Sequence, residues 1–184
     1  MPFTFRLRPG FPKAHAGALA ARRTFDDERL VDIGRRSRDA GYYDADDFLI
    51  ICESATNTKL CSANPSERIK RHTAAAIAAT SERHRICSLM RLSGISWRMA
   101  SVVLHFTFED QYPTLSRRTL WSWGYDTKPE VLNFSFWWGY VEASRNAAQE
   151  CSLTMRNLDR ALRQFATEQK EGSPPLAKAR STSA

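Results

Sequence analysis

Residues 89–124 read LMRLSGISWRMASVVLHFTFEDQYPTLSRRTLWSWG, and this stretch decides the fold class. Together with the residues just before it, the stretch predicts two helices, over residues 81–92 and 97–108, with Gly94 in the turn that joins them. The second helix is apolar almost all round, which is typical of a helix buried on most sides. The pattern therefore predicts a compact helical hairpin over residues 81–108.

Helix-start signals recur before the hairpin. Asp26 and Asp27 begin a helix that Gly41 ends, and Asp44 begins a second one. The sequence Asn64-Pro65-Ser66-Glu67 combines a capping side chain, a proline at the first helical position and an acidic residue three positions after the cap. It therefore begins a third helix, which runs to about residue 79.

Helical signals also continue after the hairpin. A short helix around Leu120 ends at Gly124, and two longer helices are predicted over about residues 135–150 and 154–168. Strand-like alternation is confined to the sequence FTFRL at residues 3–7. We therefore predict an all-α protein.

The formal net charge of +7 is spread unevenly along the chain. Residues 1–23 hold five basic residues and no acidic one, the segment from residue 171 adds +1, and the part between them holds the remaining +1. We therefore predict a basic N-terminal arm over residues 1–23, a nearly neutral helical domain over 24–170 and a disordered tail over 171–184. The basic character favours a polyanionic partner such as nucleic acid.

Several classes of site are excluded by the sequence. The four cysteines form no C-x-x-C pair and no histidine stands at ligand spacing from a cysteine, so we predict no metal site. Phosphate-binding glycine motifs are missing, so we expect no nucleotide cofactor and no other cofactor. The longest apolar stretches fall short of the roughly 20 residues that cross a bilayer, and the first residues lack the apolar core of a secretory signal. We therefore expect a cytoplasmic protein with no membrane partner.

The turn of the hairpin is a candidate phosphate site. Backbone N–H groups around Gly94, Ile95 and Ser96, at the start of the second helix, supply donors and positive potential without any basic side chain. Such a turn can hold a DNA phosphate without reading the base sequence. The alternative interpretation is plain packing of two helices that a glycine separates.

The same stretch resembles the helix-hairpin-helix DNA glycosylases of the endonuclease III superfamily. That family's pattern runs L-P-G-V-G, two or three residues, A, an apolar helix, a short loop, V-D and a helix that ends at L-G. The matching positions are Leu92, Gly94, Ile95, Ala100, Val102 to Leu104, Leu115 and Gly124. The resemblance implies a helix-hairpin-helix glycosylase-like domain with double-stranded DNA as its partner.

Within this superfamily the chain is most similar to an uncharacterised bacterial group with the motif Y-P-x-L-D-x-R-A-L-W-S-L-G. The positions that match are Tyr112, Pro113, Leu115, Arg118, Leu120, Trp121, Ser122 and Gly124. The later motifs F-W-x-x-Y and R-x-L-D-R-A-L-W of the group are matched by Phe136, Trp137, Tyr140, Arg156, Leu158, Asp159, Arg160, Ala161 and Leu162. The resemblance therefore covers roughly residues 40–168.

Two positions depart from the family in a way that affects chemistry. Ser116 lies 20 residues after Ser96, the interval at which the family places its catalytic aspartate, and Arg98 stands where lyase members have a lysine. Serine carries no negative charge near neutral pH, and arginine stays protonated. Ser96 also replaces the second glycine of the hairpin, which is unfavourable if that position needs a positive φ. We therefore expect lost or weakened glycosylase chemistry.

The expected functional residues form two groups. The DNA-binding candidates are the turn and the basic residues near it: Gly94, Ile95, Ser96, Trp97, Arg98, Arg91, Arg117 and Arg118. The candidates for a pocket that stacks an extruded base are Trp121, Trp137 and Tyr140, for which core packing is the alternative.

Three hypotheses about function remain open at this point. The first is a DNA-binding protein that resembles base-excision glycosylases but has lost their chemistry. The second is an active monofunctional glycosylase in which another acid, such as Asp110, Asp126 or Glu142, replaces the missing aspartate. The third is a helical protein-interaction domain. Fold alone does not decide among them.

Overall fold

The structure, a computed structural model, describes residues 3–23, 27–55, 58–126 and 132–171. All of its regular elements in these ranges are helices, so the all-α prediction is confirmed. They are η1 (Lys13–His15), α1 (Ala16–Arg22), α2 (Glu28–Ala40), α3 (Ala45–Ser54), α4 (Thr58–Cys61), α5 (Ser66–Ala78), α6 (Glu82–Leu89), α7 (Trp97–Thr107), α8 (Arg117–Ser122), α9 (Phe134–Glu150) and α10 (Met155–Glu171). The FTFRL segment forms no strand.

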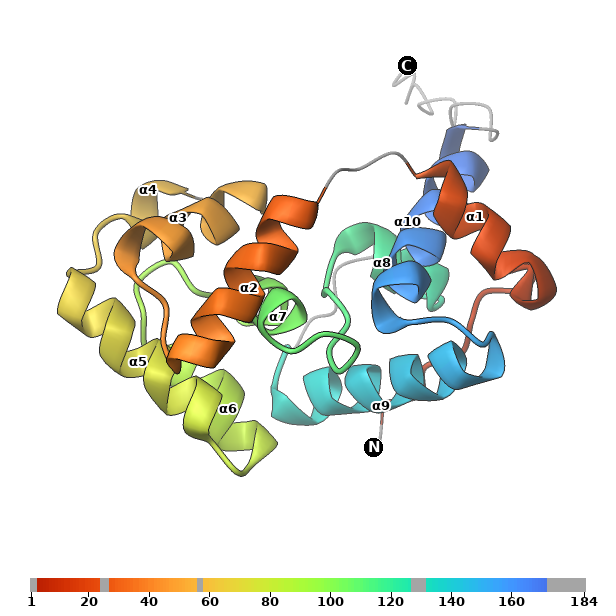
Figure 1. Cartoon of the computed structure of the whole chain (residues 1–184). Coiled ribbons are helices and arrows are strands. Elements are labelled where there is room, and N and C mark those ends of the chain that lie inside the picture. Colours follow the sequence, from red (N-terminus) through yellow and green to blue (C-terminus); the bar gives the residue numbers. More distant parts are fainter. Residues whose placement is uncertain (1–2, 24–26, 56–57, 127–131, 172–184) are drawn as a thin grey trace, which may run out of the picture.

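The helices form two lobes with a hydrophobic core in each, and α7 lies between them (Figure 1). The first core is built from α2 to α7 and also includes Trp137 and Val141 of α9. The second core joins the N-terminal segment to α8, α9 and α10. Trp97, the first residue of α7, packs against both cores, so the start of α7 lies at the junction of the lobes.

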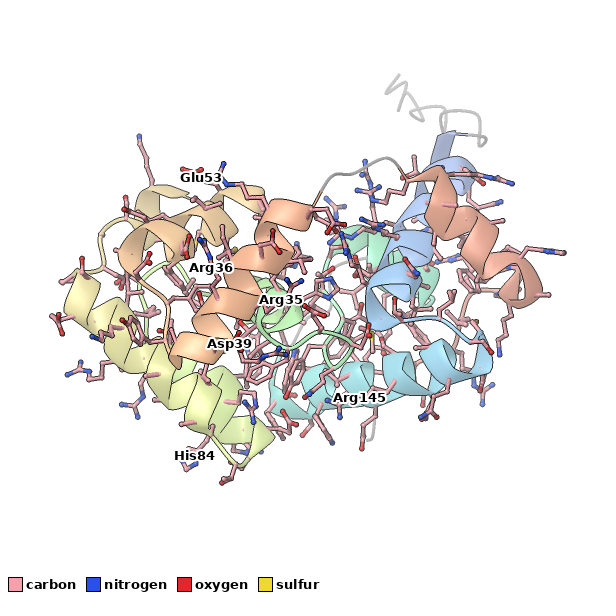
Figure 2. The ribbon with its side chains drawn as sticks, viewed as in Figure 1. Arg35, Arg36, Asp39, Glu53, His84 and Arg145 are labelled. Carbon is pink, nitrogen blue, oxygen red and sulfur yellow. The ribbon has the colours of Figure 1, made fainter. Side chains whose placement is uncertain are left out.

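Charged side chains tie the lobes together near the loop that follows α7 (Figure 2). Arg145 of α9 donates a hydrogen bond from Nε to the backbone oxygen of Gln111 at 2.9 Å. Arg35 of α2 lies 3.6 Å from a carboxylate oxygen of Glu109 in the same loop. The loop is therefore held from both lobes, although exposed ion pairs of this kind contribute only about 0–1 kcal/mol each.

The N-terminal segment packs onto α10 instead of standing apart as a basic arm. Phe11, Ala16 and Leu19 are buried in the second core, and Arg22 lies 3.2 Å from Glu168. Sequence analysis missed α1 because its alanines and leucine lie between basic residues that suggested a solvated segment. Residues 3–23 are thus part of the folded body. Of the predicted tail over residues 171–184, Glu171 is instead the last residue of α10, and residues 172–184 lie outside the described residues.

Local helix signals agree with the structure at several helix starts, although Asp27, the N-cap of α2, makes no side-chain cap hydrogen bond. Asp44 caps α3 by accepting a hydrogen bond from Asp47 N, and Gly41 ends α2 with a φ of 80°. Asn64, however, does not cap α5, whose N-cap is Pro65. The Asn64 amide instead donates to the oxygen of Ser93 at 2.9 Å and accepts from its N–H at 2.8 Å. A residue predicted to have a local role therefore holds the turn of the hairpin.

Candidate functional site

The hairpin consists of α6 and α7 with a turn over residues 90–96. Gly94 has a φ of 79°, in the region that favours glycine, while Leu92 and Ile95 are buried and Ser93 is exposed. A Cβ on Gly94 would lie 2.7 Å from the Cβ of Leu60, so α4 covers one side of the turn. The turn is therefore exposed at Ser93, whereas α4 covers it at Gly94.

Ser96 begins α7 as its N-cap. Its φ is −91° and its hydroxyl accepts a hydrogen bond from Met99 N at 3.4 Å. Serine at this position is therefore unstrained, and the expected cost of replacing the family's second glycine does not arise. The N–H groups of Ser96, Trp97 and Arg98 have no acceptor among the described residues, as is usual at the start of a helix. α7 has 11 residues, and these N–H groups lie at the positive end of its helix dipole.

A cavity of about 620 Å³ opens beside the hairpin, between the two lobes. Ser96 and Arg98 line it from the start of α7, and Ser116, Arg117 and Arg118 line it from the start of α8. The two positions that the family's spacing relates, Ser96 and Ser116, therefore share one cavity. Its volume lies in the range of small-molecule sites, about 300–1,000 Å³.

Hydrogen bonds from α7 and α9 position Ser116. The Ser101 hydroxyl accepts from Leu115 N at 2.8 Å, and the Tyr140 hydroxyl donates to the oxygen of Thr114 at 2.8 Å. Ser116 then caps α8 in a capping box: its hydroxyl accepts from Thr119 N, and the Thr119 hydroxyl accepts from Ser116 N at 3.0 Å. Ser116 thus has a structural role that its side chain fills without any carboxylate.

Two aspartates line the cavity, and both are paired with arginines. Asp159 accepts from Thr114 N at 3.2 Å and from Arg163 Nε at 2.7 Å. Asp27 accepts from Arg156 and, at 2.7 Å, from Arg160. Burial opposes ionisation of Asp27, but the hydrogen bonds and charges of the two arginines outweigh burial and leave its pKa below the usual value.

Sequence analysis missed Asp27 and Asp159 as members of the site. The acids proposed there as replacements lie elsewhere: Asp110 accepts from Met155 N, Asp126 pairs with Arg8, and Glu142 is an exposed residue of α9. None of these three lines the cavity. The one available signal for Asp159 was its place in the R-x-L-D-R motif, whereas Asp27 carried only a helix-start signal.

The candidate base-pocket residues lie in the protein core. Trp137 and Tyr140 are completely buried, and Trp121 is half-buried against Phe165 with the Arg8 guanidinium 4.0 Å from its ring centre. None of the three lines the cavity. Trp137 and Tyr140 therefore pack in the cores, which was the alternative to a base pocket.

The predicted basic residues separate into two places. Arg91 is exposed near the end of α6, and its backbone oxygen accepts a hydrogen bond from Arg68 at 2.7 Å. Arg117 and Arg118 are exposed at the edge of the cavity, and Arg98 lies half-buried inside it. Three further arginines line the cavity that were not predicted: Arg23, Arg160 and Arg163.

Other features of the described residues bear on the type of site. No group of three or more metal-ligating side chains occurs in the described part of the chain. None of the helices described is long and apolar enough to cross a membrane. The four cysteines are all free thiols.

Comparisons of the chain with protein-family models, with curated proteins and with solved structures gave no match. The residues of the site therefore carry the functional proposal.

Proposed function

We propose that this protein binds double-stranded DNA through the hairpin turn and that it has lost the base-excision chemistry of the glycosylases it resembles. One observation carries the proposal: Ser96, Trp97 and Arg98 present unbonded N–H groups at the start of α7, beside the exposed Ser93. A phosphate oxygen accepts hydrogen bonds from such groups without contact to the bases. Asn64 holds this turn in one conformation, which lowers the entropy lost on binding.

The cavity beside the hairpin supports the loss of chemistry. Base excision develops positive charge on the sugar, which an ionised carboxylate stabilises. Here Ser116 occupies the position expected for that carboxylate, and the two aspartates of the cavity are engaged with arginines. Six arginines line the same cavity and would repel a cationic sugar.

We expect duplex DNA to bind with little sequence preference and with strong salt dependence, since each neutralised phosphate releases condensed counterions. Fluorescence anisotropy over a series of salt concentrations measures this. Arg91→Ala should reduce the slope of log K against log salt by about 0.9, the value for one lost phosphate contact. Removal of residues 1–23 is not a suitable test of the contribution of their charge, because α1 belongs to the second core. Absence of duplex binding even at low salt would contradict the proposal.

We expect the wild-type protein to release no base from duplexes that carry deaminated, alkylated or oxidised bases. Ser116→Asp keeps an N-cap residue at the start of α8 and restores a carboxylate in the cavity. Chromatographic detection of free base compares wild type, Ser116→Asp and Ser116→Ala. Release by Ser116→Asp alone would support lost chemistry, whereas release by the wild type that survives Ser116→Ala would show that another residue performs it.

A further inference from the structure

The cavity between the lobes carries a large excess of positive charge. Six arginines line it against two aspartates, so the lining has an excess of four positive charges. Asp159 and Asp27 are already bonded to Arg163 and Arg160, and Asp27 also accepts from Arg156, outside the lining. No carboxylate that lines the cavity is therefore left to neutralise the remaining arginines: Arg23, Arg98, Arg117 and Arg118.

Arg98 shows most directly that the cavity suits an anion. Its Nε and Nη2 atoms are buried and have no hydrogen-bond partner among the described residues. A buried charged donor without an acceptor is unfavourable, because it has lost its hydrogen bonds to water. An anion in the cavity would supply the missing acceptors to both nitrogen atoms.

Arg23 reaches the same cavity from the N-terminal segment, where it follows α1. Burial lowers its pKa, and the positive charges of Arg163, Arg118 and Arg160 lower it further. These four guanidinium groups, all of the second lobe, are thus close enough to repel one another. Mutual repulsion of this kind is relieved when a multiply charged anion binds among them.

The remaining lining of the cavity combines polar residues, such as Ser54, His105 and Thr114, with an apolar part. Leu30, Met99, Val102, Phe106 and Leu115 contribute to it from both lobes. The cavity, at about 620 Å³, is much larger than a phosphate ion and has room for an organic group attached to one. A ligand that combines a compact dianion with an apolar or aromatic group matches both parts of this lining.

We infer that the cavity binds a phosphate monoester, with the dianionic group held by Arg98, Arg23, Arg117 and Arg118 and the organic group against the apolar wall. Arginine suits this role because its planar donor pairs match phosphate oxygens, and several arginines can bind one tetrahedral group. A carboxylate would satisfy fewer of these donors. The inference does not depend on DNA binding by the hairpin turn, since it rests on arginine side chains of the cavity, whereas the turn offers backbone N–H groups.

Isothermal titration calorimetry at low salt tests this inference with inorganic phosphate, 2′-deoxyadenosine 5′-monophosphate and 2′-deoxyadenosine. We expect the monophosphate to bind more tightly than phosphate, and the uncharged nucleoside not to bind. Arg98→Met should weaken binding of the monophosphate about tenfold or more, since it removes charge-assisted hydrogen bonds. Arg118→Gln, on the exposed edge of the cavity, should weaken it as well.

Arg71→Met is the matched control, because Arg71 is exposed on α5 and lies outside the cavity. It should bind the monophosphate as the wild type does. The inference is wrong if neither phosphate nor the monophosphate binds, if the nucleoside binds as tightly as the monophosphate, or if Arg98→Met retains wild-type affinity. These measurements contain no DNA, so their failure leaves DNA binding by the turn unaffected.

Two sources of the phosphate monoester are distinguished by a second titration. Short duplexes with phosphate or with hydroxyl groups at their strand ends are compared on wild type and Arg98→Met. Tighter binding of the phosphorylated duplex that Arg98→Met removes would assign a DNA strand end as the ligand. Equal binding of both duplexes, together with binding of the monophosphate, would assign a free phosphorylated compound.

Discussion

Gly34→Ala should destabilise the protein by about 3 kcal/mol or more, the upper range for added volume in a packed interior. A Cβ on Gly34 would lie 1.8 Å from the backbone oxygen of Phe106 and 2.3 Å from its carbonyl carbon. Both atoms belong to the backbone of α7, so no side-chain rotation relieves the overlap. α2 would have to move away from α7, whose first turn carries the donors proposed to bind DNA. Thermal denaturation should show a melting temperature lower by roughly 10 °C.

Gly17→Ala is the control for this substitution. Gly17 lies on α1, and a Cβ there would meet its nearest neighbour, Leu153, at 3.7 Å, which is ordinary contact. Alanine favours the helical state over glycine by about 1 kcal/mol, so Gly17→Ala should leave stability unchanged or raise it slightly. A Gly34→Ala protein as stable as the wild type would mean that α2 and α7 do not approach so closely.

Helix starts and ends could be predicted from the sequence because their causes are local. Ser81 was predicted to begin a helix and is the N-cap of α6, with its hydroxyl accepting from His84 N. Gly41 was predicted to end a helix and has the left-handed conformation that favours glycine. In each case the cause lies within about one turn of helix, the distance over which capping signals act.

Contacts between distant segments could not be predicted in the same way. Asn64 stands at a typical cap position, yet its amide bonds the backbone of Ser93, 29 residues away. Trp137 was weighed both as a base-stacking residue and as a core residue, and it is completely buried in the first core. Side chains of these types suit both roles, and only the packing of the helices selects one.

The concentration of positive charge in the cavity could not be predicted from the sequence either. The sum over residues 24–170 is nearly neutral, although the basic candidates Arg98, Arg117 and Arg118 lie in this part of the chain. Packing of the lobes brings Arg23 of the N-terminal segment, Arg98 of α7 and Arg163 of α10 to one cavity. The net charge of a sequence segment does not show this arrangement, because acidic residues that balance the arginines in number lie on other surfaces. Asp126, which pairs with Arg8, is an example.

Ser96→Asp should weaken binding of a duplex with hydroxyl ends about tenfold or more, equivalent to about 1.4 kcal/mol. Aspartate is as good an N-cap as serine and interacts favourably with the start of a helix, so α7 should remain intact. The added carboxylate would lie beside the N–H groups of Trp97 and Arg98 and would both occupy these donors and repel a phosphate. Fluorescence anisotropy at low salt measures the loss, and circular dichroism checks the fold.

Ser81→Asp and Ser96→Asn make this test specific. Ser81 is the exposed N-cap of α6. Ser81→Asp therefore changes the net charge by the same amount as Ser96→Asp, but at the start of the first helix of the hairpin. Asparagine at position 96 keeps a capping side chain without a charge. We expect both variants to bind DNA as the wild type does. Equal losses in Ser96→Asp and Ser81→Asp would mean that net charge alone attracts DNA, and the turn would then have no specific part in binding.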